Sequence, residues 1–135
     1  MRLFGAKIGS IVTIKPGVNI KYPWKLIVGN NCWIGENVWI DNLDIVTLAD
    51  NVCISQGVFL LCGNHNFKSS SFDLMLGPIT IESGVWLGAK SIVCPGVTVA
   101  SHAILSVASL ANKDLEPYTI YKGNPAVKFK DRIIE

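Results

Sequence analysis

The two histidines are the side chains best suited to move a proton at neutral pH, and they lie in different surroundings. His65 interrupts an otherwise repetitive sequence, within the stretch GNHNFKSSSFDL that runs from Gly63 to Leu74. A histidine has an ordinary pKa of about 6.5, which suits a general base that takes a proton from a poor nucleophile. We therefore take His65 as the candidate catalytic base. His102 lies within the repetitive sequence, and we interpret it as an exposed residue without a chemical role.

A repeat of six residues must position His65. Val, Ile or Leu occurs at every sixth position in four runs, and the residue four positions later is usually small or a valine. This period fits neither an α-helix nor a simple alternating strand. It is typical of a parallel β-helix, in which three repeats complete one triangular coil and the aliphatic side chains point inward. The repeated residues are Ile8, Ile14 and Ile20; Val28, Ile34 and Ile40; Leu48, Ile54 and Leu60; and Ile81, Leu87, Val93, Val99 and Leu105.

Breaks in the period predict where the chain leaves the prism. Three repeats take 18 residues, but Ile8 to Val28 and Val28 to Leu48 are each 20 residues apart, and Leu48 to Ile81 are 33 apart. The extra residues follow the third repeat each time, so they should lie at one corner. We expect a protruding loop there at about residues 63–78. Loops held by a rigid scaffold often carry function.

Composition limits the class of protein. A chain of 135 residues fits a single domain, 1–135. Half of the residues are hydrophobic and 16% are charged, which calls for a regular interior, an oligomer interface, or both. A net charge of +2 does not argue for a nucleic-acid partner, and neither a transmembrane run nor a signal peptide is recognised. The four cysteines lack zinc spacing and are interpreted as reduced thiols of a cytoplasmic protein. They are Cys32, Cys53, Cys62 and Cys94.

Four features together resemble a known family. They are the repeat, the loop around His65, the segment GVWLGAKSIVCPGVTV (Gly84–Val99) and the ending YTIYKGNPAVKF (Tyr118–Phe129). Over nearly the whole chain the sequence resembles the left-handed β-helix acetyltransferases, in particular the colanic acid biosynthesis type, related to maltose and galactoside O-acetyltransferases. The resemblance implies an all-β fold, a left-handed parallel β-helix of hexapeptide repeats with one protruding loop. We also expect a short C-terminal helix within about residues 117–135.

The resemblance also implies a reaction. Acetyl would pass from acetyl-CoA directly to a hydroxyl of a sugar, nucleotide sugar or polysaccharide precursor, with His65 as general base and without a metal. The enzyme would be a homotrimer with its active sites at subunit interfaces. The oxyanion that forms needs donors placed in advance, and the backbone amides of Gly88 and Ala89 match the family position.

The remaining site residues follow from the same resemblance. Trp86 matches a tryptophan near the CoA arm, and Lys113 matches a partner of a CoA phosphate. Asp41 and Asn42 fall where relatives place a polar contact to the acceptor. The expected cofactor-binding residues are Trp86, Gly88, Ala89, Ser106, Val107, Asn112, Lys113 and Lys122, and the expected substrate-binding residues are Asp41, Asn42, Phe67 and Phe72.

Several residues keep two interpretations. Asp73 either orients His65 or is a surface charge. The basic residues of the tail either collect CoA phosphates or form the solvated face of the terminal helix; they are Lys122, Lys128, Lys130 and Arg132. The tryptophans either stack on sugars or belong to the core and the trimer interface. They are Trp24, Trp33, Trp39 and Trp86.

Rival functions remain. One is N-acetylation of an amino sugar, and another is a non-catalytic trimeric remnant that lacks an N-terminal segment carried by relatives. A γ-type carbonic anhydrase would need three histidines on zinc, and this chain has two. An ice-binding β-helix would carry a ladder of threonines, which we do not expect here. The threonines considered are Thr13, Thr47, Thr80, Thr98 and Thr119.

Overall fold

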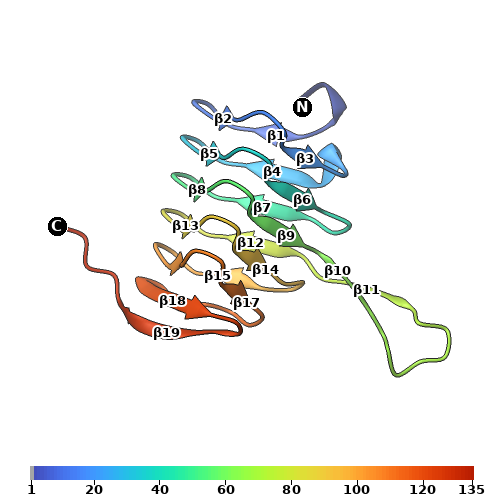
Figure 1. Ribbon diagram of the computed structural model, residues 1–135. Coiled ribbons are helices and arrows are strands. Elements are labelled where there is room, and N and C mark those ends of the chain that lie inside the picture. The colour runs from blue at the N-terminus through green and yellow to red at the C-terminus, as the bar shows by residue number, and fades with distance from the viewer. Residues whose placement is uncertain (1) are drawn as a thin grey trace.

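Short strands wind around three faces of a prism, and each strand pairs in parallel with the strand one coil further on (Figure 1). The computed structural model describes residues 2–135. Its stacked coils form the expected left-handed parallel β-helix. Sheet A contains β1 (Lys7–Ile8), β4 (Leu26–Val28), β7 (Val46–Leu48), β12 (Ile79–Ile81) and β15 (Thr98–Val99). Sheet B contains β2 (Thr13–Ile14), β5 (Trp33–Ile34), β8 (Cys53–Ile54), β13 (Trp86–Leu87), β16 (Ile104–Leu105), β18 (Thr119–Gly123) and β19 (Ala126–Asp131). Sheet C contains β3 (Asn19–Ile20), β6 (Trp39–Asp41), β9 (Phe59–Leu61), β14 (Ile92–Val93) and β17 (Leu110–Ala111).

The strand register confirms the interpretation of the repeat. Repeated aliphatic residues of successive coils lie side by side, and beyond the first coil their side chains are buried in one continuous core. Burying such a side chain contributes roughly 1.5–3 kcal/mol, so the stacks supply most of the driving force for folding. The stacks are Ile8, Val28, Leu48, Ile81 and Val99; Ile14, Ile34, Ile54, Leu87 and Leu105; and Ile20, Ile40, Leu60 and Val93.

The coils turn at three edges, and two of them matter for function. The loop edge joins sheet C to sheet A and carries all the extra residues that the period predicts. The 3-10 turn η2 (Pro23–Lys25) fills it in the first coil, and the protruding loop leaves it in the third. The loop edge comprises residues 21–25, 42–45, 62–78, 94–97 and 112–114, and the pocket edge, which joins sheet B to sheet C, comprises residues 15–18, 35–38, 55–58, 88–91 and 106–109.

The protruding loop is itself regular. Strands β10 (Gly63–His65) and β11 (Leu74–Leu76) pair antiparallel, and the Gly77 amide donates to the Cys62 carbonyl at 3.0 Å to close the base of the loop. In Figure 1 this ribbon projects away from the prism. The loop therefore holds His65 on a defined strand at a distance from the core.

The prediction of a C-terminal helix is wrong. Residues 119–131 form β18 and β19, an antiparallel pair that extends sheet B. The last coil would otherwise leave an unpaired strand edge, and pairing satisfies its backbone groups. The Arg132 guanidinium fastens the segment by donating to the carbonyls of Gly84 at 2.9 Å and His102 at 3.0 Å.

The expectation that threonines form no ladder is also wrong. Thr47, Thr80 and Thr98 are register partners on the outward side of sheet A. Thr47 and Thr80 are separated by the long loop, so counting at a fixed period hides their alignment. Sheet A thus presents a polar face, whereas the outward positions of sheets B and C carry Trp33, Trp86, Trp39 and Phe59.

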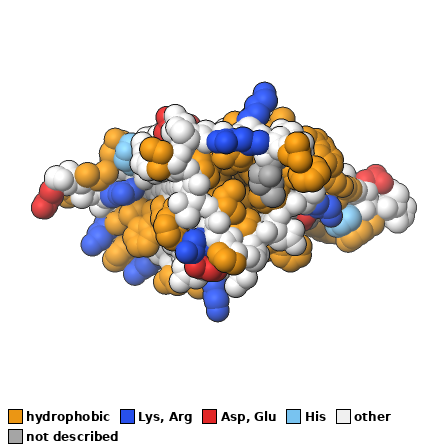
Figure 2. Space-filling model, turned by 90° about the horizontal axis from the view of Figure 1, so that it is seen from above, with side chains coloured by type: hydrophobic (Ala, Val, Ile, Leu, Met, Phe, Trp, Pro, Cys, Tyr) orange, Lys and Arg blue, Asp and Glu red, His pale blue; other side chains and the backbone are white. Residues whose placement is uncertain are grey.

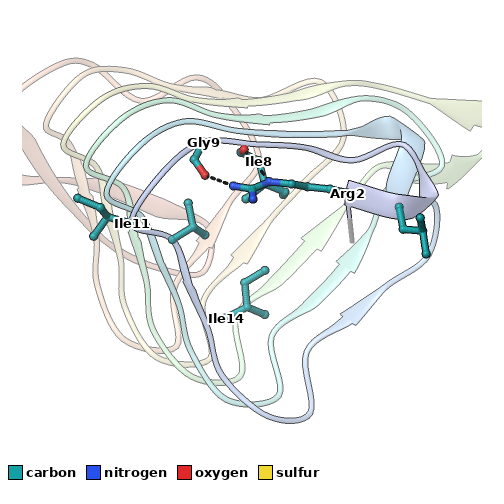
Figure 3. A pocket seen from close by; sticks show the side chains of 7 residues that line it. Arg2, Ile8, Gly9, Ile11 and Ile14 are labelled. Carbon is teal, nitrogen blue, oxygen red and sulfur yellow. Dashed lines mark hydrogen bonds between the residues drawn. The ribbon is translucent and has the colours of Figure 1, made fainter.

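The N-terminal end of the prism is open. A hollow of about 520 Å³ lies inside the first coil, lined by Ile8 and Ile14 among others. The Arg2 side chain crosses it and donates to the Gly9 carbonyl at 2.6 Å (Figure 3). Seen from above in Figure 2, hydrophobic side chains gather at this end. Among residues 2–135, Arg2 is the only charged residue in the lining, and its guanidinium already donates to the backbone carbonyls of Ile8 and Gly9.

Helices contribute little to residues 2–135. The two that the structure describes are η1 (Arg2–Phe4) and η2, each a single 3-10 turn. Within this part of the chain, no helix has the length and apolar character needed to cross a membrane.

Candidate active site

A pocket of about 500 Å³ opens on sheet B and the pocket edge. It spans three successive coils and brings together five of the expected cofactor-binding residues. As pocket residues, sequence reasoning missed Ser55, Gln56, Ile104 and Leu105, the last of which it placed only in the inward stack. Ser55 follows an inward aliphatic residue just as Gly88 and Ser106 do, so alignment of the repeats gives a signal for it. This coil pocket is lined by Ser55, Gln56, Trp86, Gly88, Ala89, Ile104, Leu105, Ser106 and Val107.

Trp86 forms a wall of the coil pocket. Its side chain is 45% exposed on the outer side of β13, between Cys53 and Ile104 of the neighbouring strands. The indole Nε1 donates to Oγ of Ser55, in the neighbouring coil, at 2.9 Å. This bond fixes the plane of the ring, so the wall has a defined orientation before any ligand arrives.

Gly88 is required because two coils approach closely. A Cβ atom at this position would lie 2.6 Å from the Val107 nitrogen and 2.8 Å from the Ser106 carbonyl carbon. The Gly88 amide donates to the Leu105 carbonyl at 2.7 Å. That amide is therefore engaged in the coil, and the structure gives Gly88 a spacing role in place of the expected role as an oxyanion donor.

The Ala89 amide differs from that of Gly88. Among residues 2–135 it has no hydrogen-bond acceptor, whereas the Ala89 carbonyl accepts from the Ala108 amide at 2.9 Å. Ala89 lies in the coil pocket just beyond β13. One backbone N–H is thus left to donate to a ligand atom in the pocket.

His65 is exposed on β10 and is held by Phe72. Its Nδ1 lies 3.0 Å from the Phe72 carbonyl oxygen. The two rings stack with centroids 4.5 Å apart and planes at 16°. A carbonyl oxygen can only accept, so this bond places the proton on Nδ1 and leaves the Nε2 lone pair free. The imidazole is therefore oriented as a base.

Phe72 acts through its backbone as well as its ring. It adopts φ of 51°, in the left-handed region that a bulky residue rarely occupies. This turn aims the Phe72 carbonyl at His65. The neighbouring Asp73, considered as the orienting group, instead accepts from the Asn66 amide through its backbone carbonyl at 2.8 Å. Sequence reasoning missed the Phe72 carbonyl because a backbone oxygen has no residue signature.

The two expected acceptor contacts on the loop edge differ in accessibility. Asp41 is half-buried at the end of β6, with its carboxylate 3.9 Å from the Lys21 ammonium. Asn42 is 0% exposed, and its amide bonds both backbone polar atoms of Tyr22. In this chain Asn42 is therefore a structural residue, and its amide is not accessible to an acceptor.

The remaining expected residues lie outside the coil pocket. Lys122 follows Tyr121, the register partner of Leu105, so it lies one coil beyond Ser106 on the same side of the prism. Its ammonium lies 3.7 Å from the centre of the Phe129 ring. Asn112 and Lys113 are exposed on the loop edge. Phe67 is exposed at the tip of the loop.

Within a single chain, His65 does not reach the coil pocket. No residue of the loop lines the pocket, which opens on sheet B and the pocket edge. Figure 1 shows β10 and β11 projecting from one side of the prism and β13 on the other. Within one chain, the oriented imidazole of His65 and the coil pocket thus lie apart.

Comparison with known proteins identifies the family. No family model matches the chain. It is 38% identical over 133 residues to the putative colanic acid biosynthesis acetyltransferase WcaF of Escherichia coli K12, covering 98% of this chain and 73% of WcaF. In structure it is similar to a hexapeptide-repeat acetyltransferase from Vibrio cholerae, with a TM-score of 0.90, 24% identity, and coverage of 96% of this chain and 75% of that one. The chain belongs to the hexapeptide-repeat acetyltransferases.

Another acetyltransferase relative has been seen with its cofactor. A galactoside acetyltransferase solved in complex with coenzyme A superposes with a TM-score of 0.87 and 25% identity, over 93% of this chain and 64% of that one. The galactoside O-acetyltransferase of Escherichia coli K12 is 29% identical over 123 residues, covering 89% of this chain and 61% of its own length. The repeat, the loop and the coil pocket are thus set in the scaffold of an acetyltransferase.

Other titratable groups of this acetyltransferase do not add to the site. Residues 2–135 contain no group of three His, Cys, Asp or Glu side chains that could share a metal ion. Burial raises the pKa of the Cys53 thiol, which lies beside Trp86, so the sulfur is held in its neutral form. His102, expected to be exposed, is half-buried, stacks on Tyr118 and has its Nδ1 2.6 Å from Ser101 Oγ.

Proposed function

We propose that this acetyltransferase moves acetyl from acetyl-CoA directly to a hydroxyl of a sugar or polysaccharide precursor, with His65 as general base. The carrying observation is the free Nε2 of His65, set by the bond from Nδ1 to the Phe72 carbonyl. The Nε2 atom takes the hydroxyl proton while the hydroxyl oxygen attacks the thioester carbonyl. The tetrahedral intermediate then collapses, the carbon–sulfur bond breaks, and the CoA sulfur takes the proton from His65 Nε2, so that CoA leaves as a thiol and the base is regenerated.

The coil pocket is the proposed site of the thioester and its pantetheine arm. The free amide of Ala89 is suited to donate to the oxyanion, which needs donors placed before the reaction. In this proposal Trp86, Ser106 and Val107, which line the coil pocket, contact the pantetheine arm. Lys122 follows one coil further on, where its ammonium suits a CoA phosphate. The neutral Cys53 thiol beside Trp86 supports transfer without a covalent enzyme intermediate.

A second copy of the chain is proposed to complete each site. The base lies on the loop edge and the pocket lies on sheet B and the pocket edge, so the loop edge of one copy must meet the pocket of the next. A contact between two different patches gives a closed ring when the rotation between copies closes, and we propose the three-membered ring, a homotrimer. Asn112 and Lys113 also lie on the loop edge, so they would reach CoA bound by the neighbouring copy. We place the enzyme in the cytoplasm, in line with its four free cysteines.

The test is release of free CoA thiol from acetyl-CoA over a panel of sugars and nucleotide sugars. We expect His65→Ala to lower kcat by about 10²–10⁴-fold with little change in CoA binding. His102→Asn is the matched control because it replaces the other histidine, whose φ of 60° is one that Asn tolerates. A His65→Ala enzyme with wild-type kcat would show that the base is assigned wrongly. CoA binding without any acceptor-dependent release would favour a non-catalytic trimer.

A further inference from the structure

An exposed aromatic pair on the loop edge has no part in the site described so far. Tyr22 and Trp24 flank Pro23, and their ring centroids lie 5.0 Å apart with planes at 35°. Trp24 is 61% exposed and Tyr22 is half-buried. Large aromatic side chains gain much from burial, so the exposed Trp24 ring beside the half-buried Tyr22 ring offers a surface on which a ligand could pack.

Hydrogen bonds from the next coil hold the turn that carries these rings. Asn42, fully buried, accepts from the Tyr22 amide at 2.9 Å and donates to the Tyr22 carbonyl at 2.7 Å. The Lys25 ammonium donates to the Leu43 carbonyl at 2.6 Å. Pro23 begins η2 with its backbone angle already set. The backbone that carries the rings is therefore held in place, which lowers the entropy cost of binding a ligand.

Charged groups lie beside the Tyr22 ring. The Lys21 ammonium lies 6.0 Å from the centre of the Tyr22 ring and 3.9 Å from the Asp41 carboxylate. In the part of the chain that the structure describes, Tyr22 Oη and Trp24 Nε1 have no hydrogen-bond partner within the protein. A sugar ring offers an apolar C–H face that packs on an aromatic ring, and hydroxyls that bond a carboxylate or an ammonium. The patch has the chemistry to take both.

The pair lies on the same edge as His65, two coils away. Ile20, Ile40 and Leu60 are register partners, so Tyr22, Asn42 and Cys62 occupy equivalent positions at the loop edge. Neighbouring strands lie about 4.8 Å apart, which puts Tyr22 roughly 10 Å along the prism from the base of the loop. A single sugar ring does not span this distance.

We propose that Tyr22 and Trp24 form a second acceptor subsite that binds a sugar ring remote from the acetylated one. This inference rests on the proposed function and specifies its substrate class: the acceptor is an oligosaccharide or a glycan chain, not a free monosaccharide. One ring presents its hydroxyl to His65 and another stacks on Trp24. Asn42 contributes indirectly as a positioning residue, because it holds the Tyr22 backbone.

The experiment measures binding of the full chain to an array of glycans from one to six sugar residues. We expect the wild type to prefer glycans of two or more residues, and Trp24→Ala to lose that affinity by about tenfold or more. Tyr22→Ala should do the same, while binding of single sugars stays unchanged. Ile11→Ala is the matched control, because Ile11 is 79% exposed in the same coil but lies at another edge.

Three results would overturn the subsite. The first is a wild type that shows no preference for glycans of two or more residues over a monosaccharide. The second is a Trp24→Ala variant that keeps this preference. The third is loss of the oligomer in Trp24→Ala by light scattering, which would make the pair a contact between copies. Acetyl transfer to the bound glycan is measured separately, so binding through Trp24 without acetylation would reject the proposed function and leave the subsite standing.

Discussion

At the scale of single residues, the main chain decides what His65 can do. The imidazole is exposed, and its ring orientation comes from the carbonyl and the ring of Phe72. The histidine and its loop were visible in the sequence because they break a strict period. Its orienting partner was not, because it depends on a left-handed φ at Phe72 that no residue type announces. Asn42 shows the same limit: a polar residue near the site turned out to hold the backbone of Tyr22.

Cys62 gives a prediction on pH. Burial raises its pKa from 9.0 to about 11. As the pH rises from 9 towards 11, the unfolded chain loses the Cys62 proton while the folded chain retains it. The unfolded state then binds fewer protons, so folding stability falls over this range. We expect the melting temperature of Cys62→Ala to decline less steeply than that of the wild type between pH 9 and 11. Parallel curves, measured by thermal denaturation, would exclude Cys62 as the titrating group.

At the scale of elements, the contact between β13 and β16 sets the shape of the coil pocket. We predict that Gly88→Ala raises the KM for acetyl-CoA, because the new methyl group would collide with the backbone of Ser106 and Val107. Gly96→Ala is the control: a Cβ there meets nothing within 4 Å, and only its φ of 78° costs energy, about 1–2 kcal/mol. Both variants should melt at a lower temperature than the wild type, but only Gly88→Ala should raise the KM for acetyl-CoA. Equal KM values would show that the pocket tolerates a wider coil spacing.

The elements also show how far the sequence can be interpreted. The six-residue period predicts the faces, the inward stacks and the loop edge, because inward packing depends only on spacing. It does not predict β19, since the segment after Gly123 has no repeat and pairs because an open strand edge is available. Nor does it show that the Gly88 amide is already bonded to Leu105, which depends on the register between coils.

At the scale of the whole molecule, the proposed trimer and the proposed interface site together specify which face of the prism points towards the common axis. The loop edge and the pocket edge both border sheet C. If the loop edge of each copy meets the pocket edge of the next, sheet C must face the common axis. Its outward positions are mostly apolar, with Trp39 stacked on Phe59 at 4.7 Å, whereas sheet A carries its threonines away from the axis. The apolar outward face of sheet C and the polar face of sheet A thus agree with the orientation that the proposed trimer requires.

This arrangement predicts that the oligomer and the activity are lost together. Light scattering should give the wild type three times the 14.7 kDa mass of one chain. Phe59→Glu puts a charge on sheet C, where burial in the interface would be costly, so it should yield monomers without transferase activity although every proposed catalytic residue is intact. Thr80→Glu, the matched change on sheet A, should leave both trimer and activity in place. A fully active Phe59→Glu monomer would mean that a single chain brings His65 to its own coil pocket, and the interface site would be wrong.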